Sequence, residues 1–309
     1  MDISVIIPTY NSSKYIKECL SSVCNVVYPD NRYEIIVIDG GSSDNTISIV
    51  STFNKVKLVH SSNISISNSR NVGVSESVGE YIIFIDSDCL VDRLLLLKAM
   101  EYLKQYSCYG SFYRAHESHG WVARAWLIVE RKQDGLVKWI TSGTLAVSRA
   151  VFEDVSGFDE SLQVEEDEDF CHRVRRNGGT LYNDSSVASV HLGQADSIKS
   201  FFVKEAWRGK SLVKPIASFH QKKVSLFDLA IFIYFISIVA VIISIVIKSI
   251  SLLFLSGIIV LILPLLLTIR VVMKAGSCEM FVSILLLYVT FLFARSWSIV
   301  KYNQFKRLF

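Results

Sequence analysis

The stretch YIIFIDSD, residues 81–88, decides the fold of this chain. Five apolar residues are followed by two aspartates, Asp86 and Asp88, with Ser87 between them. A short continuous apolar run of this kind is typical of a strand that is buried on both faces, as in parallel sheets. Ligands of such sheets bind beyond the carboxyl ends of the strands. The two aspartates therefore stand where a binding site is expected.

The sequence before this stretch repeats the same alternation. Short apolar runs at residues 3–7, 34–38 and 56–59 are each followed by a segment with a helix cap or helical spacing, at residues 15–23, 47–53 and 69–78. Strands that alternate with helices indicate an α/β domain with a mostly parallel sheet and crossover connections. The polar residues directly after each strand are therefore the candidates for a site.

Three polar segments follow the predicted strands: Pro8-Thr9-Tyr10-Asn11, Asp39-Gly40-Gly41-Ser42 and Asp86-Ser87-Asp88. Carboxylates two residues apart can hold a hard cation such as Mg²⁺ or Mn²⁺, which in turn binds phosphate oxygens. The alternative for this pair is an ordinary solvated turn. Asp39 can accept a hydrogen bond from a nucleobase or cap the next helix, and the glycines after it permit a sharp turn.

Together with S-R-N-V-G at 69–73 and E-D-E-D-F at 166–170, these motifs resemble those of the family 2 glycosyltransferases. The resemblance covers roughly residues 1–210 and implies the GT-A fold of nucleotide-diphospho-sugar transferases. It implies that the donor is bound by residues of the strand-end motifs, namely Pro8, Thr9, Asn11, Asp39, Gly40, Ser42, Arg70, Asp86 and Ser87. It implies a site for Mn²⁺ or Mg²⁺ at Asp86, Asp88 and His191. Ion pairing at the surface and a structural histidine are the alternatives for Arg70 and His191.

The acidic segment 165–169 heads a predicted helix. Acidic residues at a helix N-terminus can simply complement the helix dipole. Clustered carboxylates also raise one another's pKa, as a general base requires. The resemblance makes Asp167 this base, with an ambiguity of one residue because Glu165 precedes Glu166. It further suggests acceptor or diphosphate contacts at Gly143, Glu166, Trp207 and Arg208.

The implied reaction is a single displacement that inverts the anomeric carbon, with a nucleotide-diphosphate sugar as donor and a lipid-linked or glycan hydroxyl as acceptor. A polyprenyl-phosphate glycosyl synthase is the nearest alternative, since an acceptor phosphate needs no base. A non-catalytic sugar- or lipid-binding scaffold is a second, against which the intact aspartates argue. The chain lacks the Q-x-x-R-W motif of the processive synthases of this family.

Three long apolar segments, at residues 227–247, 250–269 and 280–300, predict a C-terminal membrane domain over 227–309. A basic linker over 211–226 is expected to separate it from the GT-A domain at 1–210. Basic residues flank the first two segments on one side, which favours a cytoplasmic location for that side. Three crossings would place Lys301, Lys306 and Arg307 outside, so the crossing of the third segment stays open.

Composition narrows the function classes further. The net charge is +3, and residues 227–309 carry seven Lys/Arg against two acidic residues, so the rest of the chain is slightly acidic. No nucleic-acid partner is therefore expected, whereas membrane lipids are. Six scattered cysteines without metal-ligand spacing indicate reduced thiols. The first strand follows residue 2 directly, so the N-terminal domain is expected in the cytoplasm.

Aromatic residues concentrate between residues 103 and 139. The group comprises Tyr109, Phe112, Tyr113, Trp121 and Trp126. Such residues can form an acceptor surface, although they more often fill a core. The sequence leaves both interpretations open.

Overall fold

The computed structural model describes residues 1–61, 65–130, 134–213 and 226–302. The chain forms two compact units. The first, called the sheet unit below, comprises residues 1–116 and 131–193, and the second, the helical unit, comprises residues 117–130 and 194–309. The chain therefore passes between the units three times.

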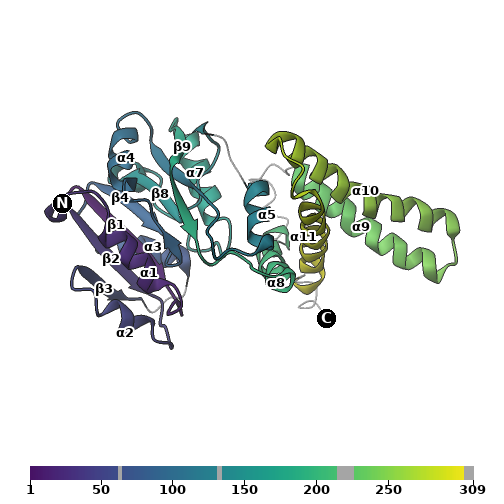
Figure 1. Ribbon diagram of the computed structural model, residues 1–309, viewed down its shortest axis with the longest axis horizontal. Coiled ribbons are helices and arrows are strands. Elements are labelled where there is room, and N and C mark those ends of the chain that lie inside the picture. Colours follow the sequence, from purple (N-terminus) through teal and green to yellow (C-terminus); the bar gives the residue numbers. More distant parts are fainter. Residues whose placement is uncertain (62–64, 131–133, 214–225, 303–309) are drawn as a thin grey trace. The chain divides into compact units, whose positions relative to one another are not determined.

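A mixed sheet forms the centre of the sheet unit (Figure 1). Its strands run in the order β3-β2-β1-β4-β8-β6-β9-β5, and β7 pairs with β9. In chain order these are β1 (Ile3–Thr9), β2 (Tyr33–Asp39), β3 (Val56–His60), β4 (Tyr81–Ile85), β5 (Cys89–Leu90), β6 (Cys108–Tyr113), β7 (Gly135–Leu136), β8 (Thr144–Ser148) and β9 (Leu181–His191). The first four strands are parallel, whereas β8 runs antiparallel to β4 and β6.

Helices cover both faces of this sheet, as the apolar strands require. They are α1 (Ile16–Cys24), α2 (Thr46–Val50), α3 (Ile66–Ser75), α4 (Leu95–Tyr102), α6 (Arg149–Asp154) and α7 (Glu166–Arg176), with a short 3-10 turn, η1 (Asp30–Arg32). Strand β1 shows the alternation. Val5 and Ile7 belong to the core that contains Leu20 of α1, while Ile6 belongs to the core that contains Phe170 of α7. The α/β architecture predicted from the sequence is confirmed.

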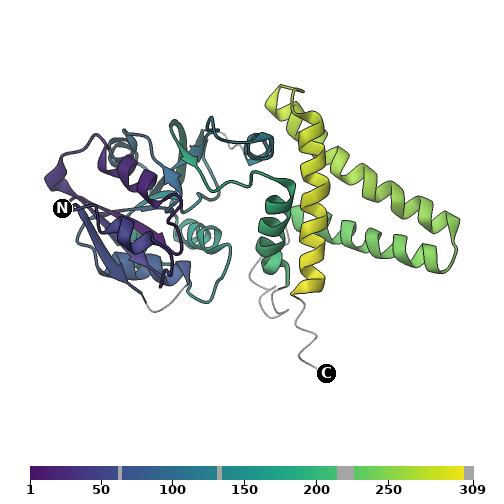
Figure 2. The ribbon, with the colours of Figure 1, turned by 60° about the horizontal axis from the view of Figure 1, so that its bottom comes forward.

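The helical unit comprises α5 (Trp121–Glu130), α8 (Ile198–Arg208), η2 (Gly209–Val213), α9 (Leu226–Val246), α10 (Ile250–Ala275) and α11 (Phe281–Lys301). Helices α9 and α10 lie side by side as a hairpin, and α11 runs across this hairpin (Figures 1 and 2). Trp126, Phe201, Leu287 and Phe291 are central to the core that joins α5, α8 and α11.

The three predicted apolar segments correspond to α9, α10 and α11, all of which are long and apolar enough to cross a membrane. Helix α10 continues past the predicted end at 269 to Ala275, because no helix breaker stands between. The two compact units divide at Gly193, while the predicted domain boundary at 210 stays a prediction. Helix α5 packs with the C-terminal helices through Val122, Ala125 and Trp126. Most of the predicted basic linker, together with Lys306 and Arg307, lies outside the described residues.

Candidate active site

The loops that follow β1 and β2 are joined to each other at one edge of the sheet. Thr9 and Asp39, the last residues of these strands, are in register. Asn11, with a left-handed φ of 49°, donates its backbone N–H to Ser42 Oγ at 2.8 Å and accepts the N–H of Ser43 at 2.9 Å. The strand-end motifs predicted to bind a donor therefore do form one surface.

Asp39 is fully buried at this edge, and its two oxygens differ. Oδ2 accepts the backbone N–H groups of Gly41 and Ser42, both at 3.0 Å. Oδ1 has no hydrogen-bond partner among the described residues, and neither has the buried hydroxyl of Thr9. Buried polar atoms of native proteins are almost always paired, so an unpaired carboxylate oxygen here is an acceptor available to a ligand. Pro8 precedes Thr9 in β1, and Gly40 directly follows Asp39 at the end of β2.

Four donor groups converge beyond β4. Oxygen, sulfur and nitrogen atoms of Asp86, Asp88, Cys89 and His191 lie within 4.8 Å of one another. His191 reaches the aspartates because β5 pairs with β9, which places Cys89 opposite His191. His191 Nε2 lies 3.2 Å from Asp88 Oδ1. The two carboxylates suit Mn²⁺ or Mg²⁺, whereas an imidazole is a ligand typical of transition metals, so the predicted metal residues fit Mn²⁺ better than Mg²⁺.

Cys89 is the member of this cluster that the sequence did not indicate. Its signal was its position directly after Asp88, since no Cys-x-x-Cys spacing marks it. Burial, and then the charges of Asp88 and Asp86, raise the pKa of the Cys89 thiol well above its usual value. In the absence of a metal it is therefore a neutral thiol.

Two glycines allow the backbone to approach the aspartates closely. A Cβ added at Gly193 would lie 1.9 Å from Asp88 Oδ2, and one added at Gly143 would lie 2.7 Å from Asp86 Oδ2. Gly143, which is predicted to contact the acceptor or the diphosphate, thus lies beside the metal cluster. Ser87 is tied to the first loop instead, because its hydroxyl lies 2.8 Å from that of Ser12.

Arg70 connects the metal cluster to α7. Its side chain is 1 % exposed, and its two terminal nitrogens donate to Asp86 Oδ1 at 2.9 Å and Glu166 Oε1 at 2.8 Å. The guanidinium also lies 5.4 Å from the centre of the Phe158 ring. The predicted nucleotide contact of Arg70 stays a prediction, while the contacts described here orient two carboxylates of the site. The neighbouring Asn71 fixes Phe158 through hydrogen bonds to its backbone N–H and carbonyl, both 2.9 Å.

The first turn of α7 separates the roles of its carboxylates. Glu166 is paired with Arg70 and Asp169 with Arg173, while Glu165 precedes the helix with a left-handed φ of 65°. Asp167 forms no ion pair among the described residues. Burial, and then the charge of Glu166, raise the pKa of Asp167 to about 6, although Arg70 acts in the opposite direction. Asp167 therefore has the environment of a general base that works near neutral pH.

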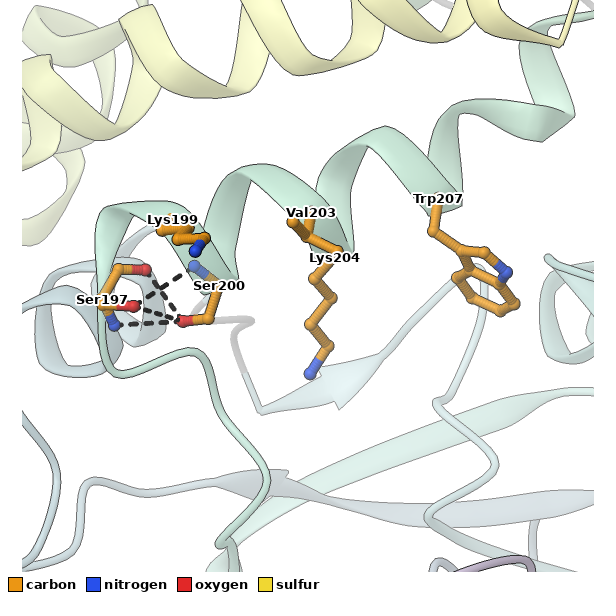
Figure 3. A pocket seen from close by; sticks show the side chains of 6 residues that line it. All are labelled: Ser197, Lys199, Ser200, Val203, Lys204 and Trp207. Carbon is orange, nitrogen blue, oxygen red and sulfur yellow. Dashed lines mark hydrogen bonds between the residues drawn. The ribbon is translucent and has the colours of Figure 1, made fainter.

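Trp207 and Arg208 belong to α8 of the helical unit. Arg208 donates to Glu205 at 2.8 Å and lies 3.8 Å from Glu130. Trp207 is half exposed and lines a shallow groove of about 560 Å³ along α8, with Ser197, Lys199, Ser200, Val203 and Lys204 (Figure 3). Their acceptor or diphosphate contacts stay predictions.

An α/β sheet that carries a two-aspartate cluster and a carboxylate with a raised pKa is the arrangement that the resemblance to the glycosyltransferases implies. The family model for glycosyl transferase family 2 matches residues 4–155. Residues 4–155 therefore form a family 2 glycosyltransferase domain, as the motifs of the sequence predicted. Curated relatives agree with this class.

Two relatives illustrate the match. Poly(ribitol-phosphate) beta-N-acetylglucosaminyltransferase TarS of Staphylococcus aureus is 33% identical over 111 residues, which is 34% of this chain and 19% of that protein. Glycosyltransferase GlyG of Streptococcus pneumoniae is 32% identical over 126 residues, 38% of this chain and 41% of that protein. The matches thus span less than half the length of these relatives.

Solved structures share the fold. Mannosyltransferase PcManGT from Pyrobaculum calidifontis, in complex with GDP-Man and Mn²⁺, aligns with a TM-score of 0.63 at 18% identity, over 99% of this chain and 87% of that chain. S. aureus TarS 1–349 in complex with UDP-GlcNAc aligns with a TM-score of 0.51 at 19% identity, over 98% and 92% of the two chains. At these identities the likeness establishes the fold and not the substrate.

Mn²⁺ binding is expected to depend on Asp88 and His191. Asp88→Asn and His191→Gln should each weaken Mn²⁺ binding by at least about 10-fold, because each removes a donor from the cluster. Titration followed by the electron paramagnetic resonance signal of free Mn²⁺ measures this without any substrate. Asp154→Asn, which changes an exposed carboxylate on α6, is the matched control. Equal affinity in all four proteins would remove Asp88 and His191 from the metal site.

Proposed function

We propose that this protein transfers a sugar from a nucleotide-diphosphate sugar to a hydroxyl group of a membrane-associated acceptor, with inversion at the anomeric carbon. The observation that carries the proposal is the meeting of three elements at one sheet edge. These are the unpaired acceptor oxygen of Asp39, the metal cluster of Asp86, Asp88 and His191, and the carboxylate of Asp167, whose pKa is raised. Each supplies one requirement of the reaction.

Donor binding is assigned to the loops after β1, β2 and β4. Oδ1 of Asp39 would accept a base N–H, with the hydroxyl of Thr9 close to the same pocket. Asp86, Asp88 and His191 would hold Mn²⁺ or Mg²⁺ beside the diphosphate. When bound, such a cation offsets the charge that develops on the leaving diphosphate. Arg70 would keep Asp86 in position through its buried ion pair.

Asp167 is assigned the role of base. Its ionised carboxylate would take the proton of the acceptor hydroxyl as that oxygen forms a bond to the anomeric carbon. The bond between this carbon and the diphosphate oxygen breaks in the same step, and the nucleotide diphosphate leaves with the electron pair. Attack from the opposite face inverts the configuration.

The acceptor class follows from two features. Helices α9 and α10 are long and apolar enough to span a membrane, which would keep the enzyme beside a lipid-linked saccharide or glycolipid. Relatives include transferases named for poly(ribitol-phosphate), a polymer. We therefore propose a role in cell-surface glycan synthesis, with the sheet unit on the cytoplasmic side, which the basic residues beside the first two apolar segments favour.

Release of nucleotide diphosphate by the detergent-purified protein tests the proposal. UDP-, GDP- and dTDP-sugars are offered with Mn²⁺ or Mg²⁺ and a polyprenyl lipid extract. We expect turnover of one donor and only with metal. A product that is a lipid-phosphate sugar would instead support the polyprenyl-phosphate synthase. Absence of both donor binding and turnover would favour a non-catalytic scaffold.

Asp39→Asn is expected to raise the KM for this donor by about 10–100-fold, a loss of one to two hydrogen-bond equivalents. Asparagine can still accept the N–H groups of Gly41 and Ser42, but it presents an N–H₂ group where the base N–H needs an acceptor. Steady-state kinetics, with Asp154→Asn as the control, measure the change. An unchanged KM would exclude Asp39 from base recognition.

A further inference from the structure

We propose that α11 does not cross the membrane but lies along its surface, on the same side as α5 and α8, with one apolar stripe in contact with lipid. The protein then has two membrane spans, α9 and α10. This inference rests on the membrane association proposed above and is independent of the reaction. Four features of the helical unit support it.

The first feature is the direction of α11. Helices α9 and α10 lie side by side, whereas α11 runs across them in both views (Figures 1 and 2). A helix of 21 residues is about 31 Å long, which spans the hydrocarbon core only when it stands nearly upright. If the hairpin spans the bilayer, α11 is too steeply inclined to it to span as well.

The second feature is a series of contacts with α5, a short helix that the chain enters from the sheet unit and leaves toward it. The centre of the Trp126 ring of α5 is 5.5 Å from that of Phe291 and 6.2 Å from that of Tyr288. Helix α5 has only ten residues, and the chain enters it from the sheet unit and returns to that unit after it. The middle of α11 is therefore held on the side from which α5 comes.

The third feature is a buried ion pair near the C-terminal end of α11. Arg295 donates from Nε and a terminal nitrogen to Glu205 Oε2 at 3.1 and 2.9 Å, and Glu205 is 1 % exposed. Ser298 Oγ donates to the carbonyl of Ala206 at 2.7 Å. A Cβ added at Gly209, the residue directly after α8, would lie 2.2 Å from Ser298 Oγ, so the chain at the end of α8 approaches α11 closely. If α11 crossed the membrane, α8 and its charged residues would be drawn into the hydrocarbon with it. That burial would cost several kcal/mol per ion.

The fourth feature is the exposed face of α11. It is a single apolar stripe with the three- and four-residue spacing of one helix face: Val282, Leu286, Val289, Phe293, Trp297 and Val300. The opposite face is buried, and 44% of the most apolar part of α11 is covered, against 22% for α9 and 17% for α10. A one-sided apolar helix that carries Trp297 in its stripe and ends at Lys301 is typical of the membrane–water interface.

The distribution of basic residues agrees with two spans. With α11 at the surface, Arg270, Lys274 and Lys301 all lie on the side of α8, and Lys248 alone lies at the far end of the hairpin. Three spans would instead place Lys301 on the far side. The tendency of basic residues to remain on the cytoplasmic side therefore favours the surface position.

Cysteine labelling with a membrane-impermeant maleimide tests the topology. Cys278 is exposed between α10 and α11, whereas Cys24 is half-buried and the other native thiols are buried. In sealed vesicles of known orientation, the full-length Cys24→Ser protein reports Cys278. The same protein with Cys278→Ser and either Ile250→Cys or Tyr302→Cys reports the other two positions.

We expect residue 302 to be labelled from the same side as Cys278, and residue 250 from the opposite side. Labelling of 302 from the side of 250 would show that α11 spans and would overturn the inference. Labelling of residues 250, 278 and 302 from one side would overturn both the surface position of α11 and the two membrane spans. It would not bear on the proposed transferase activity. Unfolding temperatures equal to that of the parent protein show that each variant is folded.

Spin labels on the stripe give an independent measurement. Leu286→Cys, Phe293→Cys and Val300→Cys each carry one label in protein reconstituted into bilayers. These sites are 14 residues apart in total, about 21 Å along a helix. A surface helix should place all three at one depth within a few ångströms. A depth gradient that approaches 20 Å would contradict the proposal.

Discussion

Asp167→Asn is expected to lower the rate of sugar transfer by about 10²–10⁴-fold, the usual contribution of a general base. The amide cannot accept the proton of the acceptor hydroxyl, whereas donor binding depends on residues of other loops. Initial rates of nucleotide diphosphate release measure the loss, and the KM for the donor should change little. In the parent enzyme, kcat/KM should fall tenfold per pH unit below pH 6, where Asp167 becomes protonated.

Asp169→Asn is the matched control, because Asp169 lies in the same helical turn but pairs with Arg173. It should retain most of the activity. Equal rates for Asp167→Asn and the parent, with a lipid-phosphate sugar as product, would contradict the assigned base and favour the polyprenyl-phosphate synthase. A fully active Asp167→Asn protein with the same pH profile as the parent would also contradict the assigned base.

The same substitution should increase thermal stability above pH 6. The pKa of Asp167 is raised from 3.8 to about 6 in the folded protein, so the fold favours the neutral acid and its ionisation destabilises the protein. Asparagine removes this penalty. The gain, on the order of 1 kcal/mol or a few degrees in Tm, should be present above pH 6 and vanish below about pH 4. A melting series over this pH range measures it.

Arg70→Met is expected to destabilise the protein by about 3–5 kcal/mol. Methionine leaves Asp86 and Glu166 without their common partner in a buried site, where unpaired charges are costly. Transfer activity should fall as well, because Asp86 loses the contact that holds it in the metal cluster. Chemical unfolding of the sheet unit within the full-length protein, followed by near-ultraviolet circular dichroism, measures the change.

A double-mutant comparison separates this ion pair from the loss of packing. Glu166→Gln removes one of the unpaired charges, so Arg70→Met with Glu166→Gln should be more stable than Arg70→Met alone. Additive effects of the two substitutions would show that the pair makes no net contribution. Lys98→Met, which removes an exposed ion pair with Glu101, should change stability by less than about 1 kcal/mol.

Local sequence signals were sufficient for the α/β architecture. Continuous apolar strands such as residues 81–85 can be stable only between two helical layers, and the structure confirms that arrangement. The strand ends could be located from the same pattern, since a polar residue must follow where burial stops. Asp39 and Asp86 lie at these ends for this reason.

The partners of the site residues could not be predicted in this way. Glu166, which accepts a hydrogen bond from Arg70, lies 96 positions away from it in the chain. No periodicity of the sequence connects these two residues. The start of α7 also needed the backbone, because the left-handed φ at Glu165 marks it, while the base role of Asp167 stays a prediction. Cys89 joins the metal cluster only because β5 pairs with β9.

The aromatic residues between residues 103 and 139 are divided between the two units. Tyr109 fills the core of the sheet unit, whereas Trp126 packs against Phe201 and Phe291 of the helical unit. Composition does not distinguish Tyr109 from Trp126. The difference lies in the elements against which each ring packs. Trp121 remains substantially exposed.

Helix α5 has a consequence for how this protein can be altered or can diverge. The helix belongs by packing to the helical unit but is encoded inside the transferase domain, so no single cut in the gene separates the two units. A chain truncated after residue 193 would keep Val122 and Trp126 but lose the helices that cover them, which exposes an apolar face and invites aggregation. For the same reason, one recombination event cannot exchange the C-terminal helices for others. Helix α5 and the C-terminal helices must change together, so substitutions on the two sides of this packing are expected to be coupled.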